Sequence, residues 1–440
     1  MEKEGFSSRL PGFYEMSWEE RLSRLAELRG LTSEEIESLG QTSGLSIALA
    51  DKLVENAIGT LGMPMGLGLN FRVNGRDYLV PMVVEEPSVI AAASFAAKLA
   101  RAGGGFQADA DDALMVAQIQ VASIPDIERA RAAILNAREE LLALAYSFHP
   151  AMVTRGGGAR DVEVRVLDAP EGPGGEPVFV VQILIDVQDA MGANLVNTVA
   201  EGVAPLVESL TGGKVWLRIL TNLADHRCAR ATCAIPIERL ATRERTGLEV
   251  AQGVLQADRF AAADPYRAAT HNKGVMNGID AVALATGNDW RAIEAGAHAF
   301  ASRNGRYAPL TRWFIDGESL VGTIELPLAV ATVGGATKVH PHVRTAFKIL
   351  GITRAKELAC VMASVGLAQN FAALRALGSV GIQKGHMALH ARCVAVEAGA
   401  RGELIEKISA LLVASGEIKV EKAKWFLGHG RNAAASSSVS

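Results

Sequence analysis

The chain has 440 residues, more than one ordinary hydrophobic core accommodates, so its length predicts two or three domains. About half of the residues (49%) are hydrophobic and 21% are charged, which is typical of globular proteins and excludes a largely disordered chain. The net charge of −4 disfavours a nucleic-acid partner. With no apolar run long enough for a membrane span and no signal-peptide pattern, we expect a cytoplasmic protein.

The first sixty residues are expected to be helical. Residues 17–20 (SWEE) and 32–35 (TSEE) both fit a capping box, in which a hydroxyl and a carboxylate satisfy free backbone N–H groups at the start of a helix. Gly30 is a suitable end for the first of these helices. Farther along, the pair Asn74-Gly75 lies between two apolar runs and predicts a tight β-hairpin.

The second strand of this hairpin ends in two adjacent carboxylates, Glu85 and Glu86, followed by Pro87. Because side chains alternate along a strand, we expect one acid in solvent and the other facing a cleft. Pro87 suits the first turn of a helix that runs to about Gly103. Two interpretations stay open. Either both acids favour the positive end of that helix, or one is a catalytic acid whose pKa must be raised by burial or by a second carboxylate.

Residues 111–222 follow the order β-α-β-β-α-β, which predicts a ferredoxin-like fold. The expected strands lie near 113–124, 161–168, 178–187 and 215–221, and the expected helices near 126–148 and 195–210. We interpret this segment as an insertion in a larger, mainly helical domain, so the expected fold class is α+β. After Leu248 long helices are expected to dominate, interrupted by one hairpin at Asp316-Gly317, and the tail 433–440 is expected to be disordered.

The third expected strand of this insertion leads directly into the sequence DAMGAN at 189–194, where a helix begins. Small residues at such a junction let a ligand approach the backbone, and free helix N–H groups favour phosphate. The dinucleotide fingerprint GxGxxG is absent from the sequence. The segment is therefore either a cofactor loop of another kind or a tight turn built from small residues.

Residues 264–296 combine basic side chains with glycine and asparagine, and we interpret their first part as a loop that binds an anionic substrate. The side chains concerned are Arg267, His271, Lys273 and Asn277. A lysine near an aspartate can stabilise an oxyanion or form a Schiff base. Asp289 follows Asn288, a suitable N-cap for the next helix. The alternative is a solvated loop with a capping aspartate.

Two histidines near the C-terminus, His386 and His390, lie four residues apart and so on one helix face. The zinc-binding pattern HExxH is absent and no carboxylate at ligand spacing replaces it, so we expect no metal. The alternatives are an acid–base histidine, His386, freed by Gly385, or a structural histidine. The four cysteines form no CxxC pair and match no zinc module, so buried thiols are expected.

Seven short motifs occur in order along the chain: ENAIG, VEEPS, DAMGAN, NGID, GNDW, GLAQN and GHMALHAR. With them the chain resembles the class II, mostly prokaryotic, 3-hydroxy-3-methylglutaryl-CoA (HMG-CoA) reductases from about Arg9 to beyond Ala400. The resemblance implies a large, mainly helical substrate domain (1–110 and 223–379), a small ferredoxin-like cofactor domain (111–222) and a C-terminal helical flap (380–440). Family members are homodimers, or assemblies of them, with the active site at the dimer interface.

The resemblance also implies a role for each motif residue. The catalytic residues that it implies are Glu86, Lys273, Asp289 and His386. The residues that it implies for substrate binding are Ser88, Arg267, Asn277, Gln369 and Asn370. The residues that it implies for binding the nicotinamide cofactor are Asp189, Met191, Gly192, Ala193, Asn194 and His149.

Cofactor choice depends on His149, which aligns with an aspartate that in some NADH-specific relatives accepts the ribose hydroxyls and repels a 2′-phosphate. A histidine neither repels phosphate strongly nor carries the fixed charge of an arginine. Because the rest of the chain resembles those relatives, we expect NADH rather than NADPH. Tyr14 replaces a basic residue that lies near CoA in a close relative, so CoA is expected to depend on other positions.

The implied reaction reduces the thioester HMG-CoA to mevalonate and free CoA with two NAD(P)H, through mevaldyl-CoA and mevaldehyde. Lys273 would stabilise the oxyanion, His386 would protonate the CoA thiolate, and Glu86 would donate a proton to mevaldehyde. Asp289 would keep the lysine charged and raise the pKa of the glutamate. The rival functions are a CoA-thioester hydrolase or acyltransferase without a redox cofactor, a Schiff-base aldolase, and a non-catalytic dimeric scaffold.

Overall fold

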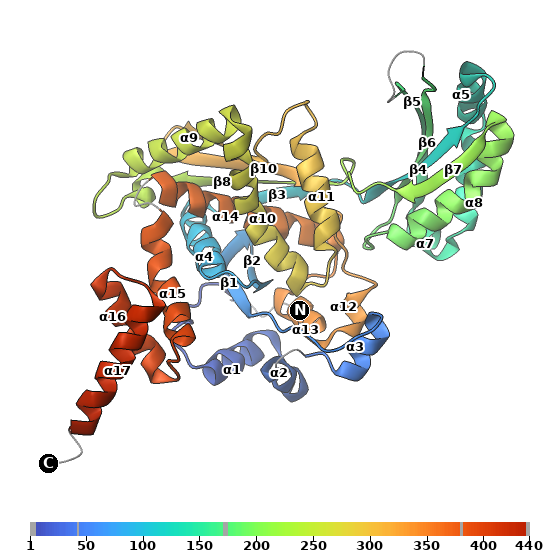
Figure 1. Ribbon diagram of the computed structural model, residues 1–440. Coiled ribbons are helices and arrows are strands. Elements are labelled where there is room, and N and C mark those ends of the chain that lie inside the picture. The colour runs from blue at the N-terminus through green and yellow to red at the C-terminus, as the bar shows by residue number, and fades with distance from the viewer. Residues whose placement is uncertain (1–5, 42–43, 170–174, 379–381, 437–440) are drawn as a thin grey trace.

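The computed structural model describes residues 6–41, 44–169, 175–378 and 382–436, and it is a mixed α+β structure with two separate sheets (Figure 1). The strands are β1 (Met65–Val73), β2 (Arg76–Val83), β3 (Phe106–Ala110), β4 (Leu114–Ala122), β5 (Gly158–Leu167), β6 (Val178–Asp186), β7 (Lys214–Leu220), β8 (Cys228–Pro236), β9 (Thr311–Asp316) and β10 (Ser319–Pro327). The helices are α1 (Trp18–Arg29), α2 (Ser33–Gly40), α3 (Ile47–Leu53), α4 (Val89–Ala100), α5 (Ile127–Asn136), α6 (Arg138–Ser147), α7 (Pro150–Thr154), α8 (Ala193–Thr211), α9 (Gly247–Ala263), α10 (Pro265–Ala285), α11 (Trp290–Ala301), α12 (Ala336–Val339), α13 (Pro341–Leu350), α14 (Ala355–Gly378), α15 (Ile382–Glu397), α16 (Glu403–Ser415) and α17 (Val420–Ser436).

The larger sheet has six strands in the order β2-β1-β3-β8-β10-β9, and its neighbours are antiparallel except for β1 and β3. Helices α4, α10 and α14 pack against it and enclose the main hydrophobic core. In the described part of the chain, α14 is the one helix whose length and hydropathy meet the criteria for a membrane span. Because 83% of its apolar window is buried inside the protein, α14 is a core helix.

The smaller sheet has four antiparallel strands in the order β5-β6-β4-β7, with α5, α6 and α8 packed against it around a second core. Strands and helices follow one another along the chain in the predicted β-α-β-β-α-β order, with one difference. The helix expected at 126–148 is interrupted at Ala137, where the backbone leaves helical geometry (ψ 12°), so that α5 and α6 are separate helices.

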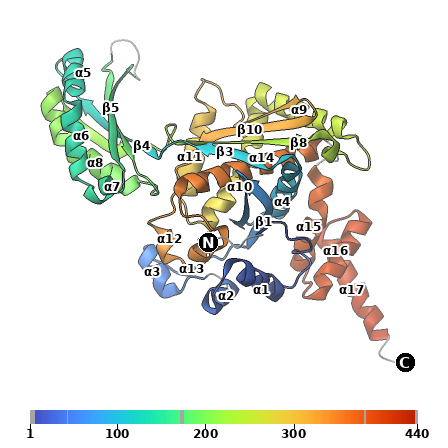
Figure 2. The ribbon, with the colours of Figure 1, turned by 180° about the vertical axis from the view of Figure 1, so that it is seen from behind.

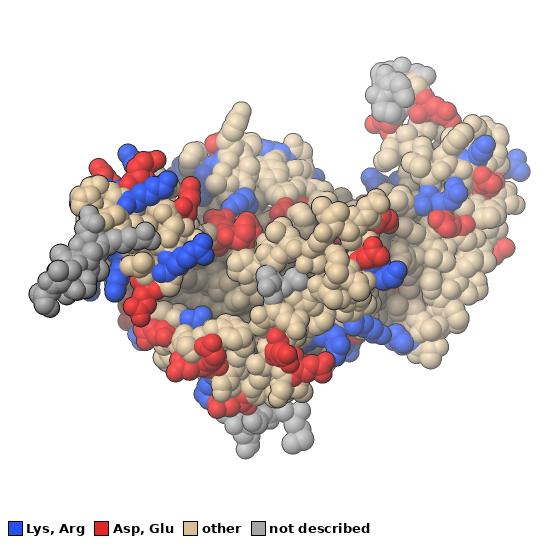
Figure 3. Space-filling view, turned by 60° about the horizontal axis from the view of Figure 1, so that its bottom comes forward, with Lys and Arg blue, Asp and Glu red and all other residues tan. Residues whose placement is uncertain are grey.

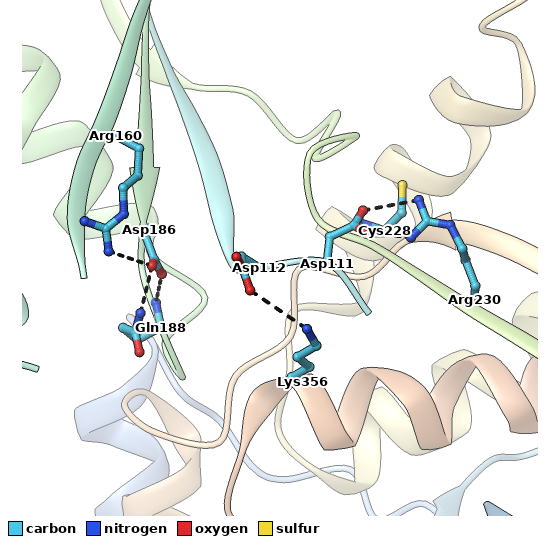
Figure 4. Close-up of polar contacts among 8 residues, drawn as sticks. All are labelled: Asp111, Asp112, Arg160, Asp186, Gln188, Cys228, Arg230 and Lys356. Atoms are coloured by element: carbon cyan, nitrogen blue, oxygen red, sulfur yellow. Dashed lines mark hydrogen bonds and ion pairs between the residues drawn. The ribbon is translucent and has the colours of Figure 1, made fainter. Parts of the chain in front are cut away.

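The four-stranded sheet is inserted between β3 and β8, which are paired neighbours in the six-stranded sheet. Ala110 faces Ala229 across this pair, so the chain leaves and re-enters the larger sheet at adjacent points. Asp111 fixes the junction because its carboxylate accepts hydrogen bonds from Arg230 Nη1 (2.6 Å) and Cys228 N (3.1 Å) (Figure 4). The smaller sheet thus extends from the body as a separate unit (Figures 1 and 2).

The features predicted for the first hundred residues are mostly confirmed. Both capping boxes are present at the starts of α1 and α2, and Gly30 ends α1 with a left-handed backbone (φ 65°). Asn74 and Gly75 both have positive φ in the turn between β1 and β2. Helix α4, however, begins two residues after Pro87, because Ser88 has a left-handed backbone (φ 73°) and separates the proline from the helix.

The segment expected to be a substrate-binding loop is in fact the helix α10, so that prediction is wrong. Asp264 caps this helix by accepting a hydrogen bond from Tyr266 N (3.2 Å), and Pro265 occupies its first position. Gly278, which contributed to the loop prediction, lies where α10 packs closely against α14. A Cβ at this position would lie 2.9 Å from Cβ of Gln369 on α14, so glycine permits the two helices to approach.

Helices α15, α16 and α17 form a third unit with an apolar cluster of its own. In both ribbon views this unit lies at the opposite end of the body from the four-stranded sheet (Figures 1 and 2). Helix α17 continues to Ser436, so the expectation of a disordered tail from residue 433 is wrong for its first four residues. Residues 437–440 lie outside the described part of the chain.

Candidate active site

The acid pair after β2 meets the lysine of α10. Lys273 Nζ donates a hydrogen bond to Glu86 Oε2 over 2.9 Å. Glu85 is exposed, whereas 37% of the Glu86 side chain and 61% of the Lys273 side chain remain accessible. The two acids therefore differ in environment as predicted, one in solvent and one against a cation. An ammonium group beside a carboxyl group can hold a carbonyl oxygen and supply it with a proton.

Asp289 has a different set of partners. It is the N-cap of α11, where its Oδ1 accepts a hydrogen bond from Ala292 N (3.1 Å), and it lies 3.5 Å from Arg291 Nε. None of the hydrogen bonds or ion pairs among the described residues joins it to the acid–lysine pair. Asn288, which was expected to be the cap, is buried and exchanges hydrogen bonds with the backbone of Ala331 instead (2.6 and 3.2 Å).

Arg267 and Asn277 lie on α10 on either side of Lys273. Asn277 is one turn farther along and therefore on the same helix face. Arg267 is half-buried, and burial lowers the pKa of its guanidinium. Among the residues that the structure describes, no carboxylate lies within ion-pair distance of it. A half-buried arginine without an acidic partner is well suited to bind the carboxylate of a ligand.

Gln369 and Asn370 of α14 have different environments. Gln369 is 6% exposed, and its Oε1 has no hydrogen-bond partner within the described structure. Asn370 is 1% exposed, and its Oδ1 accepts hydrogen bonds from Thr311 Oγ1 (3.0 Å) and Trp313 Nε1 (2.9 Å) on β9. The amide oxygen of Asn370 is therefore occupied within the core, while Gln369 retains an acceptor beside α10.

His271 points into the core and not into a loop. It is 2% exposed, and its Nε2 lies 2.6 Å from Thr311 Oγ1. Because the threonine hydroxyl donates its proton to Asn370, it accepts one from the ring, which places the ring proton on Nε2. Burial and the charge of Arg267 lower the pKa of His271 to about 3, so the ring is neutral. These hydrogen bonds tie α10, β9 and α14 together behind the lysine.

A second polar cluster joins the end of α10 to α11. Asp280 lies beside Glu294, whose Oε2 is 2.5 Å from His298 Nε2, and His298 Nδ1 lies 2.7 Å from the hydroxyl of Tyr307. Burial and then the neighbouring carboxylate raise the pKa of Asp280, whereas the hydrogen bond to His298 lowers the pKa of Glu294. The cluster holds α10 against the helix that Asp289 caps.

The DAMGAN segment is a loop attached to the body of the molecule. Asp189 Oδ1 accepts hydrogen bonds from Ala355 N (2.8 Å) and Arg354 Nε (3.2 Å) at the start of α14. Gly192 precedes α8 with φ 101°, and a Cβ there would lie 2.6 Å from a methyl group of Val187, so the position requires glycine. The loop then passes into α8, whose first N–H groups have no acceptor within the helix.

The strand that leads into this loop ends in a hydrogen-bonded carboxylate. Asp186 accepts hydrogen bonds from Arg160 Nη2 (3.0 Å), Gln188 N (3.0 Å) and Gln188 Nε2 (2.8 Å) (Figure 4). These contacts stabilise the positive φ of Gln188 (53°), which is uncommon for residues other than glycine. Across the same small cleft, Lys356 of α14 lies 3.8 Å from Asp112 (Figure 4).

The two histidines among the predicted site residues, His149 and His386, lie at α7 and on α15. His149 precedes α7 and is partly buried, and its Nε2 has no hydrogen-bond partner within the described structure. His386 lies on α15, but its side chain is outside the described part of the structure. His390, on the same helix, is exposed.

The surface carries both signs of charge. On the face shown in Figure 3, basic and acidic side chains are interspersed, in keeping with the net charge of −4. Among the described residues, no group of three His, Cys, Asp or Glu side chains has an arrangement that could hold a metal ion.

Comparison with known proteins identifies the family. The sequence profile of hydroxymethylglutaryl-coenzyme A reductase matches residues 17–391. The chain belongs to this family. It is 49% identical to the 3-hydroxy-3-methylglutaryl-coenzyme A reductase of Archaeoglobus fulgidus, over 96% of this chain and 94% of that protein.

The chain is also similar to the solved reductase of Streptococcus pneumoniae, with 43% identity and a TM-score of 0.80 over 95% of this chain and 99% of that one. A second structure from that organism, a class II reductase bound to NADPH in open conformations, matches with 45% identity and a TM-score of 0.79 over 84% of this chain and 99% of that one.

Membership in the HMG-CoA reductase family confirms the activity that the ordered motifs implied. The reductase interconverts HMG-CoA and mevalonate plus CoA with a nicotinamide cofactor. The hydrolase, aldolase and scaffold alternatives find no support in these matches.

Two features in contact with the DAMGAN loop lie outside the seven motifs. Arg227 is buried and donates hydrogen bonds to backbone carbonyls of the DAMGAN loop. Thr332 N donates to the carbonyl oxygen of Asp189 (3.0 Å), from a segment in which Gly334 and Gly335 both have positive φ. The glycine pair could have indicated a functional turn, whereas a single arginine among the 44 basic residues gives no signal.

Proposed function

We propose that Glu86 and Lys273 are the central catalytic pair of this HMG-CoA reductase. Lys273 stabilises the oxyanion that forms as the thioester is reduced, and Glu86 donates a proton to the carbonyl oxygen of mevaldehyde. The 2.9 Å contact between the two side chains carries the proposal. Both side chains remain partly accessible, so a substrate can reach them. A fixed positive charge at an oxygen that becomes negative is among the strongest contributions to catalysis.

Four further residues are proposed to hold the substrate. Arg267 would bind the carboxylate of the HMG portion, because its half-buried guanidinium lacks an acidic partner among the described residues. Asn277 shares the face of Lys273, Gln369 has a buried amide oxygen without a partner, and Ser88 lies next to the acid pair at the start of α4. Asn370 would act indirectly by holding α14 against β9.

The overall reduction takes four electrons, which two molecules of the nicotinamide nucleotide, bound one after the other, would supply as one hydride each. Collapse of mevaldyl-CoA between the two transfers releases CoA as a thiolate, and we propose that His386 protonates it. We propose that Asp289 keeps Lys273 charged during the reaction. The N-cap contact of α11 uses only Oδ1 of Asp289.

The DAMGAN loop and His149 are proposed to hold the nucleotide. The residues fit such a ligand in two respects. The N–H groups of Gly192, Ala193 and Asn194 lie at the start of the 19-residue helix α8, and His149 has a buried ring nitrogen without a partner in the described structure. Met191 and Asp189 complete the loop, with Asp189 as its anchor to α14. We propose that NADH is preferred. NADPH is accepted, since His149 carries no negative charge to repel a 2′-phosphate and one similar reductase binds NADPH.

The working enzyme is proposed to be a homodimer, or an assembly of dimers, in which the cofactor loop of one chain serves the catalytic pair of the other. Asp189 is anchored at the first residue of α14, and Gln369 lies 14 residues farther along, about 21 Å at the rise of an α-helix. The cofactor loop and Gln369 thus lie at different ends of α14, and we propose that the loop of a partner chain approaches the catalytic pair instead. Ile58 of the ENAIG segment and Leu61, two residues beyond it, are 102% and 91% exposed, and they form an apolar surface that a second copy would cover.

The decisive experiment follows absorbance at 340 nm with HMG-CoA and either NADH or NADPH, together with release of free thiol. We expect two nucleotides to be oxidised and one thiol released per HMG-CoA. Glu86→Gln is expected to lower kcat by about 100-fold or more. Glu85→Gln, the matched control at the exposed neighbouring acid, is expected to stay within about twofold of the wild type because that side chain contacts no reacting group.

Three outcomes would contradict the proposal in different ways. Thiol release without nucleotide oxidation would contradict the reductase chemistry itself. Equal losses in the two glutamate variants would contradict the assignment of the catalytic acid. Faster oxidation of NADPH than of NADH would contradict the proposed preference, and His149→Asp would then be expected to reverse it.

A further inference from the structure

Arg227 is a buried arginine whose partners are backbone carbonyls. It lies between the four-stranded sheet and β8, and 5% of it is exposed. Its Nη1 donates hydrogen bonds to the carbonyl oxygens of Ala190 (3.1 Å) and Met191 (3.4 Å), and its Nη2 donates to that of Val330 (2.5 Å). Burial lowers the pKa of Arg227 to about 10, so the side chain is still charged at neutral pH. No ion pair within 4 Å involves it in the described part of the chain.

These contacts determine the direction of two peptide groups in the DAMGAN loop. In a planar trans peptide the carbonyl and the following N–H point in opposite directions. With the carbonyls of Ala190 and Met191 directed at Arg227, the N–H groups of Met191 and Gly192 are directed away from it. Neither N–H has a hydrogen-bond acceptor among the described residues. The arginine therefore leaves two backbone donors directed away from itself, immediately before the first turn of α8, whose N–H groups have no acceptor within the helix.

Other contacts fix the same loop from the sides but do not orient these two peptides. Asp189 is bonded to the start of α14 through its side chain and to Thr332 N through its carbonyl. Gly192 is confined by Val187, which its missing Cβ would meet. Arg227 is thus the group on which the orientation of the peptides after Ala190 and Met191 depends.

We propose that Arg227 is a positioning residue for the nicotinamide cofactor, which it serves by holding the loop carbonyls so that the N–H groups of Met191 and Gly192 face the nucleotide. This inference rests on the proposed role of the DAMGAN loop. Without the guanidinium, the carbonyls of Ala190 and Met191 lose this donor and the peptides are free to rotate. The loop would then lose its nucleotide-binding donors, while the acid–lysine pair on the other elements would be unaffected.

The test compares Arg227→Met, which keeps the length of the side chain without its charge or donors, with Arg227→Lys, which keeps the charge but offers fewer, differently directed donors. Arg218→Met on the exposed surface of β7 is the matched control.

The Kd values of NADH and NADPH are measured by nucleotide fluorescence and the Kd of HMG-CoA by calorimetry. We expect Arg227→Met to weaken both nucleotides at least tenfold, Arg227→Lys to be intermediate, and all variants to bind HMG-CoA within twofold of the wild type. Unchanged nucleotide binding in folded Arg227→Met, or equal weakening of nucleotide and HMG-CoA, would overturn the proposal.

A second measurement uses the wild-type protein and does not depend on the variant folding. Hydrogen exchange at Met191 and Gly192 is expected to be fast in the free enzyme and to slow at least tenfold when NADH is bound. Exchange that is already slow without nucleotide, or that nucleotide leaves unchanged, would show that these groups do not face the cofactor. Wild-type enzyme that binds neither nucleotide would contradict the role of the loop instead, so the two failures are distinguishable.

Discussion

The buried ring of His271 makes a specific contribution to acid sensitivity. In the folded protein its pKa is lowered to about 3 by burial and by Arg267, and its Nε2 proton is committed to Thr311. In the unfolded chain a histidine titrates near 6.5. A group whose pKa is depressed by folding stabilises the protein above its unfolded pKa, and this stabilisation is lost as the pH falls toward the folded value.

The size of the effect follows from the two pKa values. Between pH 7 and pH 5 the unfolded chain takes up about 0.7 proton at this residue, whereas the folded protein takes up almost none. Proton linkage then lowers the free energy of unfolding by about 2 kcal/mol over this interval through His271 alone. The residue is 2% exposed, so solvent screens little of this contribution.

His271→Gln provides the measurement, because glutamine retains an N–H donor for Thr311 and does not titrate. Urea unfolding of wild type and variant is followed by circular dichroism at pH 7 and pH 5. We expect the wild type to lose about 2 kcal/mol more than the variant over this interval. His226→Gln, at a half-exposed histidine, is expected to behave as the wild type does. Parallel losses in wild type and His271→Gln would refute the reasoning.

Three further predictions concern other contacts. Lys273→Met is expected to lower kcat by about 100-fold or more. The thermal midpoint is expected to stay nearly unchanged, because the ion pair of Lys273 is partly exposed. A large drop in the midpoint would indicate a structural role. Asp189→Ala is expected to cost about 1 kcal/mol in calorimetric stability, because it removes the acceptor for Ala355 N; a neutral result would show that the cap contributes nothing. Gly278→Ala is expected to destabilise the protein by about 1–3 kcal/mol, because the added methyl group would clash with Gln369. The displaced glutamine is also expected to raise the KM for HMG-CoA. A normal KM would argue against the substrate role of Gln369.

Local signals in the sequence predicted much of the fold. The capping boxes and the Asn74-Gly75 turn are satisfied by residues within a few positions, so their structure follows from neighbouring chemistry. Predictions were wrong where distant contacts decide. Glycine and asparagine in α10 favoured a loop, whereas Gly278 in fact permits α14 to pack closely against the helix. No strand was predicted at β3, which is short and is defined by its pairing with β8. The break between α5 and α6 at Ala137 likewise contains no glycine or proline that would have predicted it.

The candidate site was predictable to the extent that its residues stand in contiguous motifs. Glu86 was identified from the motif VEEPS and Lys273 from the sequence HNKG at 271–274, and the structure brings them together from the end of β2 and from α10. The supporting residues could not be predicted in this way. Arg227 contacts backbone atoms, so no partner side chain reveals it, and the partners of His271 lie on two other elements.

The insertion between β3 and β8 has a consequence for the order of folding. Closing an unfolded loop of roughly 120 residues between Ala110 and Ala229 would cost about 4 kcal/mol of chain entropy. The inserted unit, however, begins in β4 and ends in β7, which pair with each other through Ala117 and Leu220. Once it has folded, only about 11 flexible residues separate the two ends, and the cost falls to about 2 kcal/mol. The central pairing of the larger sheet therefore forms most readily after the smaller unit is complete, so a slow-folding variant of the smaller unit would delay assembly of the whole chain.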